Sequence, residues 1–394
     1  MYSQQKVKSK NNILNEHLLN AKKILIEYNL CDFCLGRLFA KKFGVSSHQL
    51  LGKKIKKILH YKNKKNCSIC KDILPNLPSI VNRMIEKSSE YEFSTFVVGA
   101  VLRPSITDRD DNLRSKFRLQ GIDSVKTSIT QQLAKNFAKK SKTKIDYLYP
   151  DLTFTFNFKI DSCELQSRNL IFQGRYLKKS RGLPQKQTSC SNCIGKGCNE
   201  CSYHGITKFN SVEGKIAKFL FEKFQGTQTK ISWIGGEDKN SLVLGNGRPF
   251  FAKLLNPKKR KPKFSKKYII NGIEIHNLKK ISKIPKEAIP FKSIIELSVI
   301  TENKIDPKSL TPLKTLTKTP IAIYEKPNKR NLKSITKVKF TKSSPRSFSL
   351  RITAEGGLPI KRFVEGNNIY PNLSELISNK CECKEFDFHK ISLK

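Results

Sequence analysis

Acidic residues are scarce in this chain of 394 residues: 32 Asp and Glu stand against 76 Lys and Arg, which gives a formal net charge of +44. The sequence also lacks an apolar run that approaches the roughly 18 residues of a membrane-spanning helix. Its polar start is not followed by the apolar core of a signal peptide. We therefore expect a soluble, cytoplasmic protein. Hydrophobic residues still make up 38% of the chain, which is enough for folded domains.

The positive charge runs along the whole chain instead of forming one tail. Basic runs occur, for example, at 53–57, 139–144 and 258–261. This distribution suits a large folded surface that follows a polyanion, and nucleic acid is the leading candidate because each neutralised phosphate releases a condensed counterion. The alternative is a lysine-rich composition in which many of these side chains only solvate the surface.

The eleven cysteines of a cytoplasmic chain indicate metal binding rather than disulfides. They include two CxxC pairs separated by 32 residues, and two more pairs separated by only four. Four thiolates are the usual ligand set of a tetrahedral structural zinc site, with no coordination position left open. We therefore expect two structural zinc ions and no organic cofactor. The predicted ligands are Cys31, Cys34, Cys67 and Cys70 for one ion, and Cys190, Cys193, Cys198 and Cys201 for the other.

Other interpretations of the cysteine clusters stay open. They are four free thiols in the first quartet and a redox motif in the second, because CxxC also serves in thiol-disulfide exchange. Gly195 and Gly197 favour a short closed metal loop, since glycine permits the tight reversals that such a loop needs. His204 lies close enough in sequence to replace one thiolate. The unassigned cysteines are Cys163, Cys381 and Cys383.

Local patterns divide the chain into four parts. Apolar residues at helical spacing surround the first two CxxC pairs, which predicts a small helical domain held by metal over 1–84. Strand-like and helical runs alternate after it, and a strand at 171–177 closes a compact α/β module over 85–180. A Cys-rich knuckle occupies 181–205. The remainder, 206–394, is rich in strands, so the expected fold class is α+β and multidomain.

The most informative stretch is WIGGEDKNSLVLGNGRPF, which runs from Trp233 to Phe250. A hydrophobic strand enters a Gly-Gly turn, the acidic pair Glu237-Asp238 follows, and a second Gly-rich turn leads to another strand. Glycines let the backbone approach a ligand closely and fix a carboxylate on a rigid loop. The alternative is an ordinary turn with solvated acids.

A second glycine-rich stretch, GGLPIKRFV at 356–364, follows a strand near the end of the chain. It can bring a cation and an aliphatic side chain to the same pocket as the acidic pair. A buried carboxylate needs such a cationic or hydrogen-bonding partner to stay ionised.

With these motifs the chain resembles the THUMP-containing tRNA pseudouridine synthases of archaea and eukaryotes, which make the paired pseudouridines of the TΨC loop at tRNA positions 54 and 55. The resemblance spans almost the whole chain. It rests on the N-terminal CxxC pairs, SRGLPQ at 180–185, the CxxCxGxGCxxC cluster, GGED with LGNGRPF at 235–250, and GGLPIK at 356–361.

The resemblance implies a role for each residue that matches a family motif. Asp238 is expected to be the nucleophile that attacks a flipped uridine, and Lys361 is expected to pair with it. Leu358 and Ile360 are expected to pack beneath the base. Phe291 stands where the family has a tyrosine that stacks on the uracil. Module 85–180 corresponds to a THUMP-like RNA-binding domain, and 206–394 to a pseudouridine synthase catalytic domain with a central, mainly antiparallel sheet.

Arg248, in LGNGRPF, is a candidate substrate contact through a phosphate, with a brace of the catalytic loop as the equal alternative. Glu237 is expected to be a structural acid, and Trp233 a core residue. The implied partner is tRNA, and neither a membrane nor an obligate protein partner is expected.

Three positions depart from the family pattern. Gly236 replaces the arginine of Gly-Arg-Glu-Asp, Phe291 lacks the tyrosine hydroxyl, and Pro359 replaces a second tyrosine. These changes indicate altered specificity or weakened activity around one pocket. We expect an active synthase that isomerises uridine, because Asp238 and Lys361 are present. The alternative is a noncatalytic tRNA-binding or RNA-chaperone protein derived from the family.

Two other enzyme classes that carry THUMP domains fit less well. A thiouridine synthetase needs a Ser-Gly-Gly-x-Asp-Ser loop, which IGGEDKNS at 234–241 matches only loosely. A THUMP methyltransferase needs a glycine-rich nucleotide loop and an Asn/Asp-Pro-Pro-Tyr motif, and neither is present.

Overall fold

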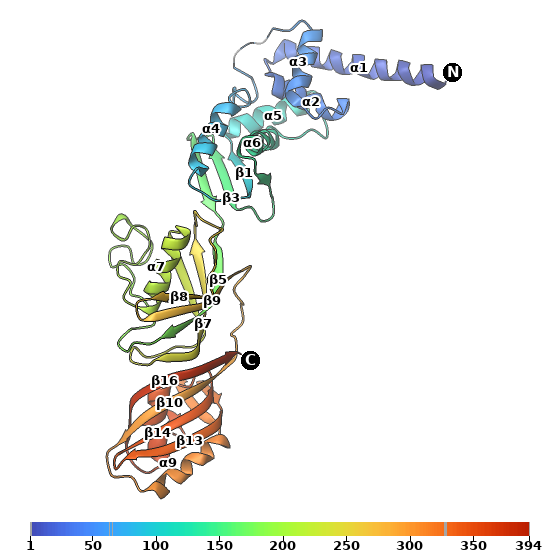
Figure 1. Ribbon diagram of the computed structural model, residues 1–394. Helices are drawn as coiled ribbons and strands as arrows, with labels where there is room; N and C mark the ends of the chain where they lie inside the picture. The colour runs from blue at the N-terminus through green and yellow to red at the C-terminus, as the bar shows by residue number, and fades with distance from the viewer. Residues whose placement is uncertain (1, 63, 65, 327–328, 394) are drawn as a thin grey trace. The chain divides into compact units, whose positions relative to one another are not determined.

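The computed structural model describes the backbone of residues 2–62, 64, 66–326 and 329–393, and the side chains of residues 15–62, 64, 66–325 and 330–393. The chain folds into two compact units, Met1–Arg168 and Asn169–Lys394, which Figure 1 colours from blue to green and from green to red. Among the described residues, none of the helices combines the length and hydrophobicity needed to cross a lipid bilayer.

The first unit begins with four helices around the first Cys cluster. Two glycines let α2 and α3 approach backbone to backbone: a Cβ on Gly36 would overlap the carbonyl of His48, and one on Gly52 would overlap the carbonyl of Asp32. The Ser47 hydroxyl caps α3 by accepting a hydrogen bond from the Leu50 N–H. The helices are α1 (Tyr2–Glu27), α2 (Asp32–Phe43), α3 (His48–Ile58) and α4 (Leu77–Ser88).

The α/β part of the first unit is a four-stranded sheet in the order β2-β1-β3-β4, with β1 parallel to both neighbours and β3 antiparallel to β4. Rings of Phe96, Phe137 and Phe154 meet between the sheet and α6. One hydrophobic cluster joins the four N-terminal helices to this sheet, so the two expected domains share a core. The elements are β1 (Thr95–Val101), α5 (Pro104–Lys116), α6 (Val125–Ser141), β2 (Lys144–Ile145), β3 (Leu152–Asn157) and β4 (Ser162–Ser167).

The second unit is built on a nine-stranded sheet in the order β13-β14-β10-β16-β7-β5-β9-β8, with β6 paired to β7. Its described pairings are antiparallel except for a single parallel bridge, Phe388 to Val243, between β16 and β7. The prediction of a central, mainly antiparallel sheet is therefore confirmed. The strands are β5 (Leu170–Lys178), β6 (Gln228–Trp233), β7 (Val243–Leu255), β8 (Lys267–Ile270), β9 (Ile273–Ile281), β10 (Phe291–Thr301), β13 (Ile335–Ser344), β14 (Ser347–Glu355) and β16 (Cys381–Leu393).

Smaller elements cover this sheet or connect its strands. Helix α7 packs its buried face on the β5 and β7 half, where Phe224 contacts Phe172 with ring centroids 4.7 Å apart (Figure 1). The remaining elements are η1 (Asn199–Cys201), α7 (Val212–Phe224), η2 (Pro307–Thr317), β11 (Ile321–Lys326), β12 (Lys329–Lys333), α8 (Ile360–Glu365), β15 (Ile369–Tyr370) and α9 (Leu373–Leu376).

Strand β5 lies in a different unit from the one that the sequence predicted. We expected it to close the α/β module at 85–180, but it pairs with β7 and β9 in the large sheet. Its side chains Phe172 and Tyr176 are fully buried in the core of the second unit. The division therefore falls after Arg168 instead of after residue 180. A strand pattern predicts a strand but not its partner, because pairing depends on long-range burial.

Candidate active site

A cleft of about 290 Å³ opens in the second unit between the β6–β7 loop, the start of β10, the turn that leads into α8, and the side chains of β16. Five residues predicted from the sequence line it: Asp238, Arg248, Phe291, Leu358 and Ile360. The structure therefore gathers segments that are more than a hundred residues apart in the sequence.

Asp238 lies in the loop after β6, and its carboxylate is held on both sides. Its Oδ1 accepts the backbone N–H of Asn240 at 2.9 Å, and its Oδ2 accepts from Nζ of Lys361 at 2.9 Å. The side chain is 28% exposed, so solvent and a substrate can reach it. Burial raises its pKa, but the Asn240 N–H and the hydrogen bond and charges of Lys361 and Lys178 outweigh it and bring the pKa below its ordinary value. Asp238 is thus an ionised carboxylate at neutral pH.

Lys361 reaches Asp238 from the first turn of α8. Its neighbour Ile360 is buried in the core, as is Leu358 just before the helix, so the backbone that carries Lys361 is anchored from below. The hydrogen bond with Asp238 raises the pKa of Lys361, which keeps the ammonium charged. The ion pair joins α8 to the loop after β6.

Phe291, the first residue of β10, fits between two glycine backbones. A Cβ on Gly235 would lie 2.6 Å from Cζ of Phe291 and 2.7 Å from Nη1 of Arg248, and one on Gly356 would overlap the same ring. The Gly356 N–H donates to the Phe291 carbonyl at 2.8 Å. Gly235 also has φ of +77°, which favours glycine. Both glycine motifs therefore serve to seat one aromatic ring in the cleft.

A fully buried charge cluster lies beneath the Asp238 loop. Glu237 accepts from Nε of Arg248 at 3.1 Å and from the hydroxyl of Tyr176 at 2.9 Å, and its Oε1 lies 3.3 Å from Nζ of Lys178. Glu237, Arg248 and Lys178 have no exposed side-chain surface. The Gln185 amide donates to the same Tyr176 hydroxyl and to the Gly235 carbonyl. Sequence reasoning predicted Glu237 as a structural acid but missed Lys178, Tyr176 and Gln185.

Lys178 fixes the backbone of the Asp238 loop directly. Its ammonium donates to the carbonyls of Asp238 at 2.9 Å, Lys239 at 3.2 Å and Leu183 at 3.0 Å. Burial lowers the pKa of Lys178, and the nearby Glu237 carboxylate opposes that shift. The only feature of the sequence that could have indicated Lys178 is its place at the end of a strand just before SRGLPQ. The carbonyls that it contacts lie up to 61 residues away in the sequence.

Arg248 has the contacts of a loop brace. Besides Glu237, its guanidinium donates to the Ile234 carbonyl at 3.0 Å and lies 4.3 Å from the ring centroid of Phe388. It is fully buried against the back of the cleft. Of the two roles considered for this residue, bracing is the one with contacts in the structure, and a substrate contact stays a prediction.

Each predicted cysteine quartet converges on one point. In both groups the four sulfur atoms lie within 4.8 Å of one another. In the second group, backbone N–H groups of Gly197 and Gly205 donate to the sulfurs of Cys193 and Cys201 at 3.1 and 3.2 Å. Such clustered sulfurs with N–H donors around them are compatible with structural zinc.

The remaining candidates for metal binding point elsewhere. Nδ1 of His204 is 2.7 Å from the Thr227 carbonyl, and its ring stacks on Phe221 at 3.9 Å, so His204 is not part of the second quartet. The unassigned cysteines Cys381 and Cys383 are buried in β16, and burial raises their pKa to about 11 and about 12. Burial thus disfavours the thiolate form that reacts.

Comparison with known families matches both units of the chain. The family model described as "Pus10, C-terminal" matches residues 171–392, and the model described as "Pus10 THUMP domain, archaeal" matches residues 80–157. The second match confirms the predicted THUMP-like module. The first begins at residue 171, next to the boundary between the two units.

Similar proteins extend over nearly the full length. The protein named tRNA pseudouridine synthase Pus10 of Nitrosopumilus maritimus is 50% identical over 374 residues, which cover 95% of this chain and 97% of that protein. Proteins of the same name from Cenarchaeum symbiosum and Methanocaldococcus jannaschii are 34% and 29% identical, and each alignment covers 93% of this chain and 90% and 93% of those proteins, respectively.

Proposed function

Because this chain belongs to the Pus10 family of tRNA pseudouridine synthases, we propose that it isomerises uridine to pseudouridine in the TΨC loop of tRNA, at position 54, position 55 or both, with Asp238 as the nucleophile. The observation that carries this proposal is the ion pair of Asp238 with Lys361 at the cleft. The pair keeps the carboxylate charged and aimed where a flipped base can enter.

The chemistry needs only what the cleft contains. The uridine leaves the base stack at a cost of a few kcal/mol, and stacking on Phe291 offsets part of that cost. The Asp238 carboxylate attacks either the base or the sugar carbon, the glycosidic bond to nitrogen breaks, and the base rejoins the sugar through carbon 5. One proton moves from carbon 5 to nitrogen 1, so no oxidant or reductant is consumed. Phe291 has no hydroxyl, so this proton transfer does not pass through it.

Leu358 and Ile360 form the apolar floor of the proposed base site. Both are at most 8% exposed and line the cleft beside Asp238. An apolar floor excludes water from the glycosidic bond while it is broken, which protects the intermediate from hydrolysis.

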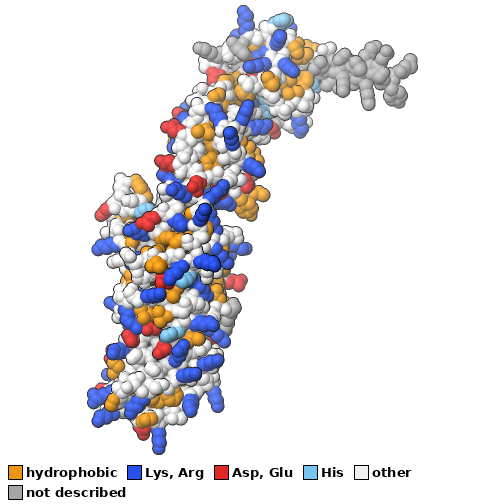
Figure 2. Space-filling model, viewed as in Figure 1, with side chains coloured by type: hydrophobic (Ala, Val, Ile, Leu, Met, Phe, Trp, Pro, Cys, Tyr) orange, Lys and Arg blue, Asp and Glu red, His pale blue; other side chains and the backbone are white. Residues whose placement is uncertain are grey.

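The first unit is proposed to hold the tRNA. Lys and Arg side chains are spread over the face of this unit that is visible in Figure 2, as expected for binding along a phosphate backbone. We propose one zinc ion in each cysteine quartet, bound by the four thiolates of that quartet, with a structural role. The enzyme is further proposed to act in the cytoplasm.

Mapping pseudouridine after incubation with an unmodified tRNA transcript tests the proposal. The protein should form pseudouridine in the TΨC loop, and Asp238→Asn should abolish the product while tRNA affinity stays within about twofold, since the change removes one partly exposed charge. Asp161→Asn, which removes an exposed carboxylate of the first unit, should keep full activity. A protein that binds tRNA without forming product would instead support the noncatalytic alternative.

A further inference from the structure

A second cavity, of about 480 Å³, lies in the first unit between the loop after Cys70 and the start of α5. Lys71, Arg103 and Arg109 supply three cations to its wall, and no acidic residue lines it. Ser105 adds a hydroxyl, and Phe158 adds an aromatic ring. Its lining residues belong neither to the family motifs quoted above nor to the catalytic cleft.

The cations of this cavity are not neutralised by the protein. Lys71, Arg103 and Arg109 have no carboxylate partner among the described residues, and Nε of Arg109 is buried without a hydrogen-bond partner there. Most other arginines of the unit are ion-paired with aspartates. Those pairs are Arg37 with Asp110, Arg83 with Asp161, Arg114 with Asp111, and Arg168 with Asp151. Three cations that line one cavity with no acidic residue in its wall favour an anionic ligand.

The backbone adds to the positive potential. Arg103 is the N-cap residue of the 13-residue helix α5, and no side chain caps this end. Pro104 follows it, so the first free N–H of the helix is that of Ser105, at the cavity wall. An uncapped helix N-terminus favours a negative ligand.

The aromatic wall suits a base next to that anion. Phe158 is half-buried and is fixed by the hydrogen bond from its N–H to the Val101 carbonyl at 2.9 Å, and its ring packs on Phe156 at 4.6 Å. A ring fixed in this way beside a cationic cluster is a stacking platform for a nucleobase.

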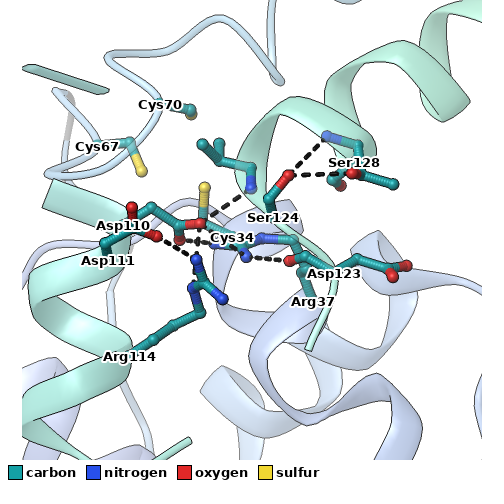
Figure 3. A network of polar contacts seen from close by, with 12 residues as sticks. Cys34, Arg37, Cys67, Cys70, Asp110, Asp111, Arg114, Asp123, Ser124 and Ser128 are labelled. Atoms are coloured by element: carbon teal, nitrogen blue, oxygen red, sulfur yellow. Dashed lines mark hydrogen bonds and ion pairs between the residues drawn. The ribbon is translucent and has the colours of Figure 1, made fainter. Parts of the chain in front are cut away.

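Two sets of contacts hold the cavity walls, and Figure 3 shows one of them, the polar network around Arg37 and Asp110. Lys71 directly follows Cys70, and its N–H donates to the Cys67 carbonyl at 3.1 Å, so the cysteine quartet places it. Helix α5 is placed by Asp110, which forms a buried ion pair with Arg37 of α2 and accepts the Val125 N–H at 2.9 Å. The cysteine quartet and the Asp110 contacts thus fix the positions of both walls of the cavity.

We propose that this cavity binds one nucleotide of the tRNA substrate, its phosphate between Lys71, Arg103 and Arg109 and its base on Phe158. The cavity is thus a binding site distinct from the catalytic cleft. This proposal rests on the proposed function only for the identity of the RNA. The occupant is an RNA phosphate because phosphate geometry matches two guanidinium groups and a helix N-terminus.

Equilibrium binding of unmodified tRNA transcript to the full-length protein tests the site without relying on catalysis. Arg103→Gln with Arg109→Gln should weaken affinity about tenfold or more, because charge-assisted hydrogen bonds are lost. The slope of log affinity against log salt should fall by about 0.7–0.9 for each lost phosphate contact. Phe158→Leu should weaken affinity about tenfold and leave that slope unchanged, because it removes only stacking.

The matched control is Arg118→Gln, an exposed arginine of the same unit that does not line the cavity. The rate with saturating tRNA should be unchanged in all three variants, because Asp238 is in the other unit. Equal affinity losses in the cavity variants and Arg118→Gln would overturn the proposal, as would a lower saturated rate with unchanged affinity. If the wild-type protein binds tRNA but makes no pseudouridine, the proposed function fails while the binding comparison still decides the fate of the cavity.

Discussion

Nζ of Lys361 lies 2.9 Å from Oδ2 of Asp238 although the two residues are 123 positions apart. The contact joins the first turn of α8 to the loop after β6, whose Asp238 lines the cleft. Two glycine-rich stretches of the chain frame this contact. Each brings backbone close to Phe291, and together they leave the carboxylate and the ammonium facing each other.

Lys361→Met should move the acidic limb of the pH–rate profile to higher pH. As the proposed nucleophile, Asp238 must be ionised, and its folded pKa lies below the ordinary value because Lys361 and the other donors outweigh burial. Without Lys361 the burial contribution remains, so the pKa of Asp238 rises and activity is lost earlier as pH falls. Single-turnover rates measured across acidic pH give the limb directly.

Arg362→Met is the matched control for that profile. Arg362 lies on the same helix but donates to the carbonyls of Asn367 and Tyr324 instead of to Asp238. Its acidic limb should coincide with that of the wild type. A Lys361→Met profile that also coincides with the wild type would show that the ammonium does not control the ionisation of Asp238.

Glu237→Gln should destabilise the protein far more than Lys178→Met. Glu237 is the single carboxylate between two buried cations, so its loss leaves Lys178 and Arg248 unneutralised, at a cost of about 3–5 kcal/mol.

Lys178→Met leaves the Glu237–Arg248 pair balanced but releases three loop carbonyls. Its saturated rate should fall about a hundredfold through misplacement of the loop. Urea unfolding and rates at saturating tRNA measure the two effects, and the opposite order of stabilities would contradict the charge cluster.

Gly236→Arg should raise kcat/KM for tRNA. A Cβ at Gly236 would have only Oε1 of Gln185 within 4 Å, at 3.8 Å, and Gly236 is not in the left-handed region, so a side chain fits. An arginine here restores the family pattern and adds a cation at the cleft. The ratio kcat/KM should rise about tenfold through a hydrogen bond to a phosphate.

Gly235→Ala, one residue earlier, gives the opposite expectation. Its Cβ would press on Phe291 and Arg248, and the residue has φ of +77°. This variant should lose nearly all activity, because the ring and the brace cannot both stay in place. If Gly236→Arg were as damaging as Gly235→Ala, the space beside Gly236 would not be accessible.

Metal analysis of the purified protein should find two zinc ions per chain. Cys34→Ser should lose one of them and weaken tRNA binding, because the first quartet holds the loop that carries Lys71. Cys163→Ser, a buried cysteine in β4 outside both quartets, should keep both ions. A wild-type protein without zinc would contradict the assignment of both quartets as zinc sites.

The sequence alone predicted the parts of this protein that depend on local spacing. Paired CxxC motifs predicted the two cysteine clusters, because two thiols three positions apart can face one point whatever the surrounding fold. The glycine-rich motifs indicated Asp238 and Lys361 through the family resemblance. Asp238 lines the cleft and Lys361 pairs with it. The strand-rich pattern of 206–394 predicted that this part of the chain is built on a sheet.

Only the tertiary structure decided which distant segments meet. In the folded chain β5 pairs within the large sheet, Lys178 is buried beside Glu237, and Arg248 braces the loop after β6. It also placed Lys71 across from α5 to form the cationic cavity. The physical reason is that burial, strand partners and charge pairing are properties of long-range packing, whereas sequence periodicity reports only what each segment does with its own neighbours.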